Sequence, residues 1–416
     1  MGIFAAPSRA RNALLVALVV SALGPRAAGD APEVTALRVQ DPSTQSAPAP
    51  STRDRGSLPQ RPWSSPAIEA AVRRGLDHLA RQQLPATGAV ALGADAAGER
   101  AHVAVTALAA LAWMSGGSTT NRGPHQQEVT RALEYLLACT ERAGDEHPGY
   151  VHDRQDSISR MHGQGLAALA FAEAYTLSPE SSLGRRLSET LKLVVERIEV
   201  SQGAEGGWYY DPFRTAAHEG SVTVSLVQAL RAARNAGILV NPGVIARAVQ
   251  YLERSQLQER GADGALPRDF GGFRYSLVDA QTSVALTAAG LSTLHATGVY
   301  DGPVVRDGYD YIWRKLAARE VDLARGDTSA HPAFPYYERF YLAQALWQNP
   351  DPTTFARWAS DEFPRIVAAQ RADGAWDDVR NGAGGRVHGR YGTSYATATN
   401  CIVLSLPESQ LPILAR

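Results

Sequence analysis

Six stretches without a charged side chain recur through the sequence, and their spacing constrains the fold more than any other feature. Their starts are separated by roughly 60 residues, and a fixed period of this kind is typical of repeat architectures. A helix without charge on any side is usually buried. The chain therefore contains six segments that are expected to be buried on all sides. The uncharged stretches are Val103–Met114, Gly163–Ala172, Ser221–Leu230, Gln281–Leu294, Phe340–Trp347 and Thr393–Leu406.

Each uncharged stretch is preceded by an amphipathic segment. Between Leu187 and Ile198, for example, the apolar residues fall on one helical stripe and the charged residues fall largely elsewhere. Each pair is predicted to form a helical hairpin with a solvated outer helix and a buried inner helix. The predicted outer helices are Pro66–Gln83, Gln126–Arg142, Ser182–Gln202, Pro242–Gln256, Val304–Arg319 and Thr353–Gln370.

Six inner helices that each need cover on every side favour a closed ring over an open superhelix. The sequence therefore predicts an all-α fold, an (α/α)6 toroid of six helical hairpins, for residues 65–416. The two cysteines, Cys139 and Cys401, fall on an outer and an inner helix that are far apart in the repeat order. Two free thiols are favoured there over a disulfide.

The N-terminal region has the pattern of a targeting segment. Arg9 and Arg11 precede an apolar run, Ala13–Leu23, and the small residues Ala27-Ala28-Gly29 follow it. This pattern predicts a signal peptide over residues 1–29 and an exported protein, periplasmic or extracellular. The run is too short for a stable transmembrane anchor. Residues 30–64 are rich in Pro, Ser and Ala and are predicted to be a disordered linker.

Net charge excludes one class of partner. The formal net charge of the 416 residues is −1, which leaves no basic surface for nucleic acid. A small-molecule ligand is the expected partner.

The loops that lead from outer to inner helices are longer than the returning ones, and long ordered loops are usually functional. All of them lie where the inner helices begin, so that end of the ring is the predicted mouth of a central cavity. Three histidines at equivalent repeat positions could converge there as metal ligands. They lack a short-spaced ligand pair, so neither a metal nor a cofactor is predicted. The candidate ligand-binding residues are His102, His162, Gln164, His218, Gln281, Tyr337, Tyr341, Tyr391 and Tyr395.

Three carboxylates are the candidate catalytic groups. Glu219, Asp279 and Glu338 stand at or near inner-helix starts, and paired carboxylates act as acid and base in glycosidases. Acidic residues at such positions also serve simply to cap helices. The tyrosines named above could line a cavity for an apolar or a sugar ligand, or fill the core.

One short motif resembles that of a known family. Gln370-x-x-x-Gly374-x-Trp376 is similar to the core of the repeat in squalene–hopene cyclases and protein prenyltransferase β-subunits, and Gln202–Trp208 is a close variant. Gln83–Gly88 and Gln256–Gly272 are weaker versions. From about residue 66 onward the chain resembles the exported, single-toroid prenyltransferase and squalene oxidase repeat proteins of bacteria. This resemblance implies a terpenoid-cyclase fold with a central cavity for an apolar or isoprenoid ligand.

The catalytic motifs of that family do not carry over. The chain has no Asp-x-Asp-Asp sequence, and neither Cys139 nor Cys401 is preceded by the Asp-x pair of the prenyltransferase zinc site. The expected function is thus an exported toroid that binds or transforms an apolar ligand, and whether it is an enzyme stays open. One alternative is an (α/α)6 carbohydrate-active enzyme, either a glycosidase or a lyase. The other is a non-catalytic envelope interaction protein.

Overall fold

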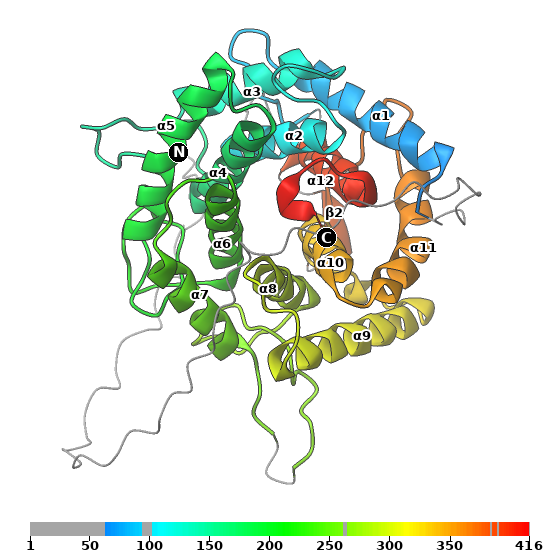
Figure 1. Ribbon diagram of the computed structural model, residues 1–416. Helices are drawn as coiled ribbons and strands as arrows, with labels where there is room; N and C mark the ends of the chain where they lie inside the picture. Colours follow the sequence, from blue (N-terminus) through cyan, green and yellow to red (C-terminus); the bar gives the residue numbers. More distant parts are fainter. Residues whose placement is uncertain (1–62, 94–101, 261–263, 383–384, 389–390, 416) are drawn as a thin grey trace, which may run out of the picture. The chain divides into compact units, whose positions relative to one another are not determined.

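The computed structural model of the protein describes residues 63–93, 102–260, 264–382, 385–388 and 391–415, all within one compact unit. Figure 1 shows six inner helices surrounded by six outer helices in this unit. The inner helices are α2 (Val103–Ser115), α4 (Arg160–Leu177), α6 (Gly220–Asn235), α8 (Val284–Ala296), α10 (Pro335–Gln348) and α12 (Gly392–Ser405). The outer helices are α1 (Pro66–Gln82), α3 (Gln126–Ala138), α5 (Ser182–Val200), α7 (Pro242–Ser255), α9 (Pro303–Ala324) and α11 (Pro352–Ala368).

The inner helices form a closed ring. Each contacts the next one along the chain, and α12 returns to contact both α2 and α1. The prediction of an (α/α)6 toroid is confirmed. Two short strands, β1 (Val379–Gly382) and β2 (Gly385–His388), form an antiparallel hairpin in the loop before α12. The shorter 3-10 helices are η2 (Thr328–Ala330), η3 (Leu406–Glu408) and η4 (Pro412–Leu414).

The pattern of burial follows the charge pattern of the sequence. All residues from Thr106 to Ser115 of α2 are buried, whereas on α5 only one stripe, including Leu187, Leu191 and Val194, is buried. The largest difference from the predicted boundaries is in the fifth hairpin. There α9 extends to Ala324 rather than Arg319, and α10 begins at Pro335, before the uncharged stretch.

At four of the six joints, a glutamine after the outer helix joins its hairpin to the outer helix of the next one. After α5, Gln202 Nε2 donates to the carbonyl oxygens of Gly206 in its own loop and Val244 on α7, both at 2.9 Å. We call this arrangement a clamp. The clamps at the other joints join Gln83 to Gly88 and Glu128, Gln256 to Gly271 and Val304, and Gln370 to Gly374 and Ala71.

The loop residue of each clamp has to be glycine. Gly206 has φ +90°, and a Cβ atom there would overlap the backbone carbonyl of Arg247 on α7. Because only glycine tolerates this backbone conformation and this close approach, the clamp explains the Gln-and-Gly spacing in the sequence. The clamp of Gln370 lies between the α11 loop and α1, so it closes the ring.

The second joint uses a different residue for the same purpose. Cys139 stands where the other hairpins have glutamine, and Gln164 on α4 instead donates to the carbonyls of Gly149 (3.0 Å) and Val194 (3.4 Å). Its Oε1 also accepts from Val151 N at 2.7 Å. Gln164, a candidate ligand-binding residue in the sequence, therefore has its amide engaged in the scaffold. In four other hairpins the loop backbone N–H that corresponds to Val151 N donates to a threonine hydroxyl of the inner helix. These threonines are Thr106, Thr223, Thr287 and Thr397.

The fifth joint has no clamp. The loop from 325 to 334 lacks the Gln-and-Gly pair, and a groove runs there between α9 and α11 with α10 as its floor. The absent clamp thus coincides with an opening between neighbouring outer helices.

The C-terminal tail covers the end of the ring opposite the long loops. Leu411, Ile413 and Leu414 lie against inner-helix residues of α2, α4, α6, α10 and α12. Trp347 Nε1 donates to the Leu414 carbonyl at 3.0 Å. The buried carboxylate of Glu173 accepts from Ile413 N at 3.4 Å. A ligand therefore approaches the ring centre from the end where the inner helices begin.

Cys139 and Cys401 are both free thiols. Among the residues that the structure describes, no helix combines the length and the apolar character needed to cross a membrane.

Candidate functional site

Four inner helices have a partly exposed residue in their first turn, at the end where a cavity mouth was predicted. His162 of α4, Ser221 of α6, Tyr337 of α10 and Tyr395 of α12 are each partly exposed, although most residues of these helices are buried. These residues stand at the ends that the loops surround. We therefore take them, together with Glu219, Tyr210, Tyr275 and Tyr341, as the candidate site and call this set the central cluster.

A hydrogen-bonded chain links three residues of this cluster. Ser221 Oγ lies 2.7 and 2.9 Å from the two carboxylate oxygens of Glu219 and 3.3 Å from His162 Nε2. A carboxylate only accepts, so the short contact takes the hydroxyl proton of Ser221. The network then assigns the ring proton of His162 to Nε2, which donates to Ser221, and leaves a lone pair on Nδ1.

Glu219 is fixed by the start of α6. It is the N-cap residue, and its carboxylate accepts from Val222 N at 2.6 Å and from Ser221 N at 2.9 Å. Its side chain is fully buried, and burial raises its pKa although these hydrogen bonds oppose that shift. Glu219 thus orients Ser221, and through it His162, rather than facing solvent itself.

His162 is held as a neutral base. Burial lowers the pKa of this imidazole to about 4, so it is uncharged at neutral pH and its lone pair is available. It lies beside Tyr210, with the ring centroids 5.9 Å apart. The hydroxyls of Tyr210 and Tyr275 lie 3.0 Å apart. Together these two tyrosines form one wall beside the histidine.

Arg160, the first residue of α4, contacts the Tyr210 side of that wall. Its guanidinium lies 5.3 Å from the centre of the Tyr210 ring and pairs with Asp211. Arg160 has φ +42°, and among the described residues it is the one non-glycine with a positive φ. Backbone strain of this kind is concentrated at functional sites. Its position two residues before His162 supports the choice of this cluster.

Tyr337 carries a polar group without a partner. Its hydroxyl is buried and makes no hydrogen bond in the structure, and its ring lies 4.8 Å from that of Tyr341. Burial, with the nearby Tyr341 and Glu219, raises the pKa of Tyr337 well above its ordinary value, so the hydroxyl stays protonated. Several described residues have such an unpartnered buried atom, and Tyr337 is the one among them that belongs to the central cluster, so its hydroxyl is a candidate donor to a ligand.

The structure separates the three candidate carboxylates. Asp279 accepts from Gln281 N at 2.9 Å within its own turn, and Gln281 itself is exposed. Glu338 points away from the ring centre and makes a bidentate ion pair with Arg319 of α9. Of the three, Glu219 is the one that belongs to the central cluster.

The other candidate residues have varied positions. His102 is buried at the N-cap of α2, and His218 Nδ1 lies 3.1 Å from the Tyr251 hydroxyl. Tyr391 and Tyr395 lie together at the start of α12, with their rings 5.2 Å apart. Within the described part of the chain, no three His, Cys, Asp or Glu side chains are arranged to hold a metal ion.

Four residues of or beside the site were not singled out by sequence reasoning: Ser221, Tyr210, Tyr275 and Arg160. Tyr210 and Tyr275 had a signal, because both stand in aromatic loop segments shortly before an inner helix. Ser221 was hidden inside an uncharged stretch. Nothing in the sequence indicates the backbone conformation of Arg160.

The chain matches no protein-family model and no curated protein sequence. Solved structures do share its fold. A cellobiose 2-epimerase from Spirochaeta thermophila DSM 6192 aligns with a TM-score of 0.53 at 16% identity, over 81% of this chain and 96% of that chain. A D-mannose isomerase aligns with a TM-score of 0.52 at 13% identity, over 84% and 99%. An α-1,6-mannanase of Salegentibacter sp. HEL1_6, complexed with α-1,6-mannotetrose, aligns with a TM-score of 0.53 at 10% identity, over 82% and 99%.

These neighbours overturn the assignment to the prenyltransferase and squalene oxidase repeat family, and with it the apolar or isoprenoid ligand. The compared structures are carbohydrate-active enzymes of the (α/α)6 type. The clamps give the physical reason for the error. The residues Gln370, Gly374 and Trp376 that carried the resemblance join one hairpin to the next, so the motif reports how a ring is built and not what it binds. At these identities the neighbours show that the fold of this chain is that of (α/α)6 toroid enzymes.

Proposed function

We propose that the protein is a carbohydrate-active enzyme that transfers a proton at a carbon atom of a sugar, as in epimerisation or isomerisation. The observation that supports this most is the hydrogen-bonded chain from His162 through Ser221 to Glu219, which fixes a neutral imidazole in the cluster that also contains the unpaired hydroxyl of Tyr337. The cellobiose 2-epimerase and the D-mannose isomerase that share the fold are enzymes that rearrange sugars without hydrolysing them.

The central cluster supplies the two groups that such a reaction needs. In the open-chain form of an aldose, His162 removes the proton from C2 and the C–H electron pair forms a C1–C2 double bond. The carbonyl electron pair moves onto O1, which receives a hydrogen bond or a proton from Tyr337. Rotation of the intermediate about its C2–C3 bond presents the other face to His162, so return of the proton to C2, with O1 again a carbonyl oxygen, gives the epimer. Return of the proton to C1, with transfer of the O2 proton to O1 through Tyr337 so that C2=O forms, gives the ketose.

Hydrolysis has less support. Glycosidases of the usual type need two carboxylates on opposite sides of the glycosidic bond. In this structure Asp279 is engaged in its own turn and Glu338 is paired with Arg319, so Glu219 has neither of them beside it. Glu219 is itself occupied by the start of α6.

Exchange with heavy water tests the proposal. Purified protein is incubated in D2O with glucose, mannose, cellobiose and mannobiose, and nuclear magnetic resonance follows both deuterium at C2 and the formation of the epimer or ketose. We expect wild type to exchange at least one of these sugars. His162→Asn should abolish the exchange, and Ser221→Ala should reduce it strongly. His147→Asn, which changes a histidine outside the cluster, should exchange as wild type does.

Two results contradict the proposal. One is wild type that exchanges none of the sugars. The other is a His162→Asn variant that exchanges at the wild-type rate. Release of reducing ends from mannan by wild type, without exchange at C2, would instead favour a glycosidase.

We also propose that residues 1–29 are a signal peptide for export to the periplasm or beyond and that residues 30–64 are a linker to the toroid. The support comes from the sequence pattern, because these residues, apart from 63 and 64, lie outside those that the structure describes. Mass spectrometry of the protein recovered from outside the cytoplasm would identify its N-terminus. An intact Met1 there would contradict cleavage.

A further inference from the structure

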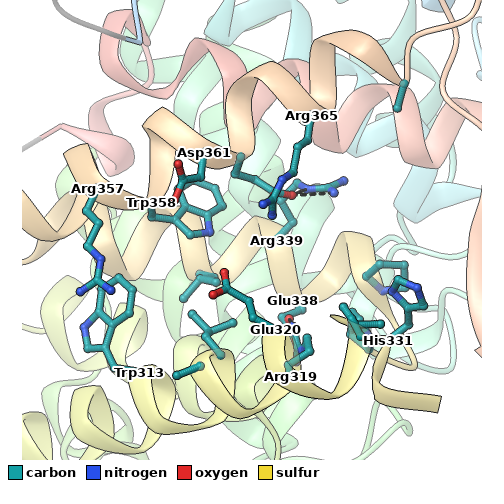
Figure 2. Close-up of a pocket in the computed structure, with 18 residues that line it drawn as sticks. Trp313, Arg319, Glu320, His331, Glu338, Arg339, Arg357, Trp358, Asp361 and Arg365 are labelled. Carbon is teal, nitrogen blue, oxygen red and sulfur yellow. Dashed lines mark hydrogen bonds and ion pairs between the residues drawn. The ribbon is translucent and has the colours of Figure 1, made fainter. Parts of the chain in front are cut away.

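The unclamped fifth joint opens into a groove of about 500 Å³ on the outside of the ring. We call it the fifth-joint groove. Figure 2 shows its lining side chains, most of which come from α9, α10 and α11, while His331 comes from the loop before α10. Its volume lies within the range of roughly 300–1,000 Å³ that is usual for small-molecule sites. The central cluster contributes no residue to its lining.

The floor of the groove is held by paired charges. Arg319 of α9 forms its bidentate ion pair with Glu338 of α10, and Arg339 of α10 lies 2.8 Å from Glu362 of α11. Arg339 also donates to Asn400 of α12 at 3.0 Å. These pairs tie the three groove helices together and keep the groove in shape without the missing clamp.

Two carboxylates on the walls are not used by these pairs. Glu320 on α9 and Asp361 on α11 are exposed, and neither forms an ion pair or a hydrogen bond with another residue in the described part of the chain. In Figure 2, Glu320 projects from α9 into the space between the helices, and Asp361 lies beside Trp358 on α11. They are therefore available to accept hydrogen bonds from a ligand.

Two indole rings also line the groove. Trp313 and Trp358, both partly exposed, line the groove from opposite helices. The guanidinium of Arg357 lies 4.9 Å from the centre of the Trp313 ring. The groove thus places flat apolar faces, acceptor-only carboxylates and donor-only guanidinium groups within one surface.

We propose that the fifth-joint groove binds an oligosaccharide. Four arginines and four acidic residues line it, so its charges balance and an uncharged ligand suits it better than an ion. Sugar hydroxyls both donate and accept, and can therefore satisfy Glu320, Asp361 and Arg365 together. The C–H face of a sugar ring packs on an indole. This inference goes beyond the proposed function, because it assigns a binding surface that is separate from the catalytic cluster.

Affinity electrophoresis tests the groove. The full-length protein is run in native gels that contain mannan or hydroxyethyl cellulose, and retardation gives a dissociation constant. Trp313→Ala should raise that constant at least about tenfold. The double variant Glu320→Ala/Asp361→Ala should do the same with little change in melting temperature, because both side chains are exposed and unpaired. Tyr300→Ala removes an aromatic side chain outside the groove, half exposed at 50%, and should be retarded as wild type is.

The outcome separates this inference from the proposed function. His162→Asn should lose exchange at C2 and keep its retardation, while the two groove variants should lose retardation and keep exchange on free sugars. Retardation by neither polysaccharide, or equal retardation of wild type and both groove variants, would overturn the oligosaccharide site. Retardation that depends on Trp313 in a protein without exchange would support the groove and contradict the catalytic proposal.

Discussion

At the scale of single residues, the hydroxyl of Tyr337 separates a functional role from a structural one. A buried hydroxyl without a partner costs about 1–3 kcal/mol, so a scaffold gains nothing by keeping it. Tyr337→Phe should therefore leave the melting temperature unchanged or raise it, while exchange at C2 falls at least about tenfold because O1 of the sugar loses its donor. Thermal unfolding followed by circular dichroism, together with the exchange assay, measures both quantities.

Tyr311→Phe is the matched control for that variant. The Tyr311 hydroxyl donates to Thr282 Oγ1 at 3.0 Å, so its removal breaks a bond that exists. It should cost about 1 kcal/mol of stability and leave exchange intact. Equal losses of stability in the two variants would mean that the Tyr337 hydroxyl has a structural partner.

The sequence predicted part of the site. His162 and Glu219 were candidates because both stand where an uncharged stretch begins, and their position along a repeat locates them in the ring. Sequence position does not show which way a side chain points. Glu338 was a candidate for the same reason, yet it faces outward to Arg319, because it lies one residue, about 100°, further around α10 than Tyr337 of the central cluster.

At the scale of the elements, the clamps make a sharp prediction about glycine. Gly206→Ala should destabilise the protein by more than the roughly 1–2 kcal/mol that a left-handed alanine costs, because its Cβ would also overlap the Arg247 carbonyl. Gly237 has a similar φ of +82°, and no atom lies within 4 Å of the position that a Cβ would take there, so Gly237→Ala should show the conformational cost alone. Urea unfolding of the two variants gives the difference. Equal costs would mean that α7 simply moves aside.

At the second joint the glutamine of the clamp can be moved from the inner helix to the position that it has in other hairpins. Gln164→Thr alone should lose at least about 1 kcal/mol, because the carbonyls of Gly149 and Val194 lose their donor. Adding Cys139→Gln restores the pattern of the other hairpins, so the double variant should recover much of that loss. A double-mutant cycle from urea unfolding measures the coupling. Additive effects would show that Gln164 does not replace the missing glutamine.

The repeat was readable from sequence because buried inner helices exclude charge and outer helices carry it on one face. The uncharged stretches and the amphipathic segments before them were enough to predict six hairpins in a closed ring. The resemblance failed as a guide to chemistry because the same glutamines and glycines are needed by any ring with such joints. The hairpin of β1 and β2 was not predicted, since its sequence lies in a loop without the alternation of a strand.

At the scale of the whole molecule, buried titratable groups set the pH of greatest stability. Burial lowers the pKa of His162 and of four other histidines below 6.5, so unfolding takes up protons and stability is lost as the pH falls through and below that value. Burial raises the pKa of the Glu173 carboxyl from 4.5 to about 8, so stability is lost as the pH rises between those two values. The melting temperature should therefore peak near pH 6.5. The other histidines are His78, His125, His218 and His295.

Glu173→Gln should reduce the decline on the alkaline side, to which Glu219, whose pKa burial also raises, contributes as well. The amide oxygen can still accept from Ile413 N, and no buried charge has to form. At pH 8 the variant should have a clearly higher melting temperature than wild type, because its free energy of unfolding is larger by roughly a few kcal/mol. At pH 5 the two melting temperatures should be nearly equal. Glu189→Gln, an exposed change on α5, should follow wild type at both pH values. A Glu173→Gln variant that declines as wild type does would show that Glu173 is not the group responsible.

The ring of hairpins is closed by contacts between its first and last members, so the position of the chain ends within the ring can be changed. The Trp63 ring lies 5.9 Å from that of Phe355, which lies 5.0 Å from that of Trp347, whose indole binds the Leu414 carbonyl. Trp63, the first described residue, and Leu414, next to the last described residue, thus contact one pair of aromatic rings, Phe355 and Trp347, while the clamp of Gln370 joins the last hairpin to the first. A circular permutant with its old ends linked and new ends in the loop from 325 to 334 would keep every clamp. Such a chain should fold into the same ring, as circular dichroism would show. Its new ends would then lie at the one joint that has no clamp.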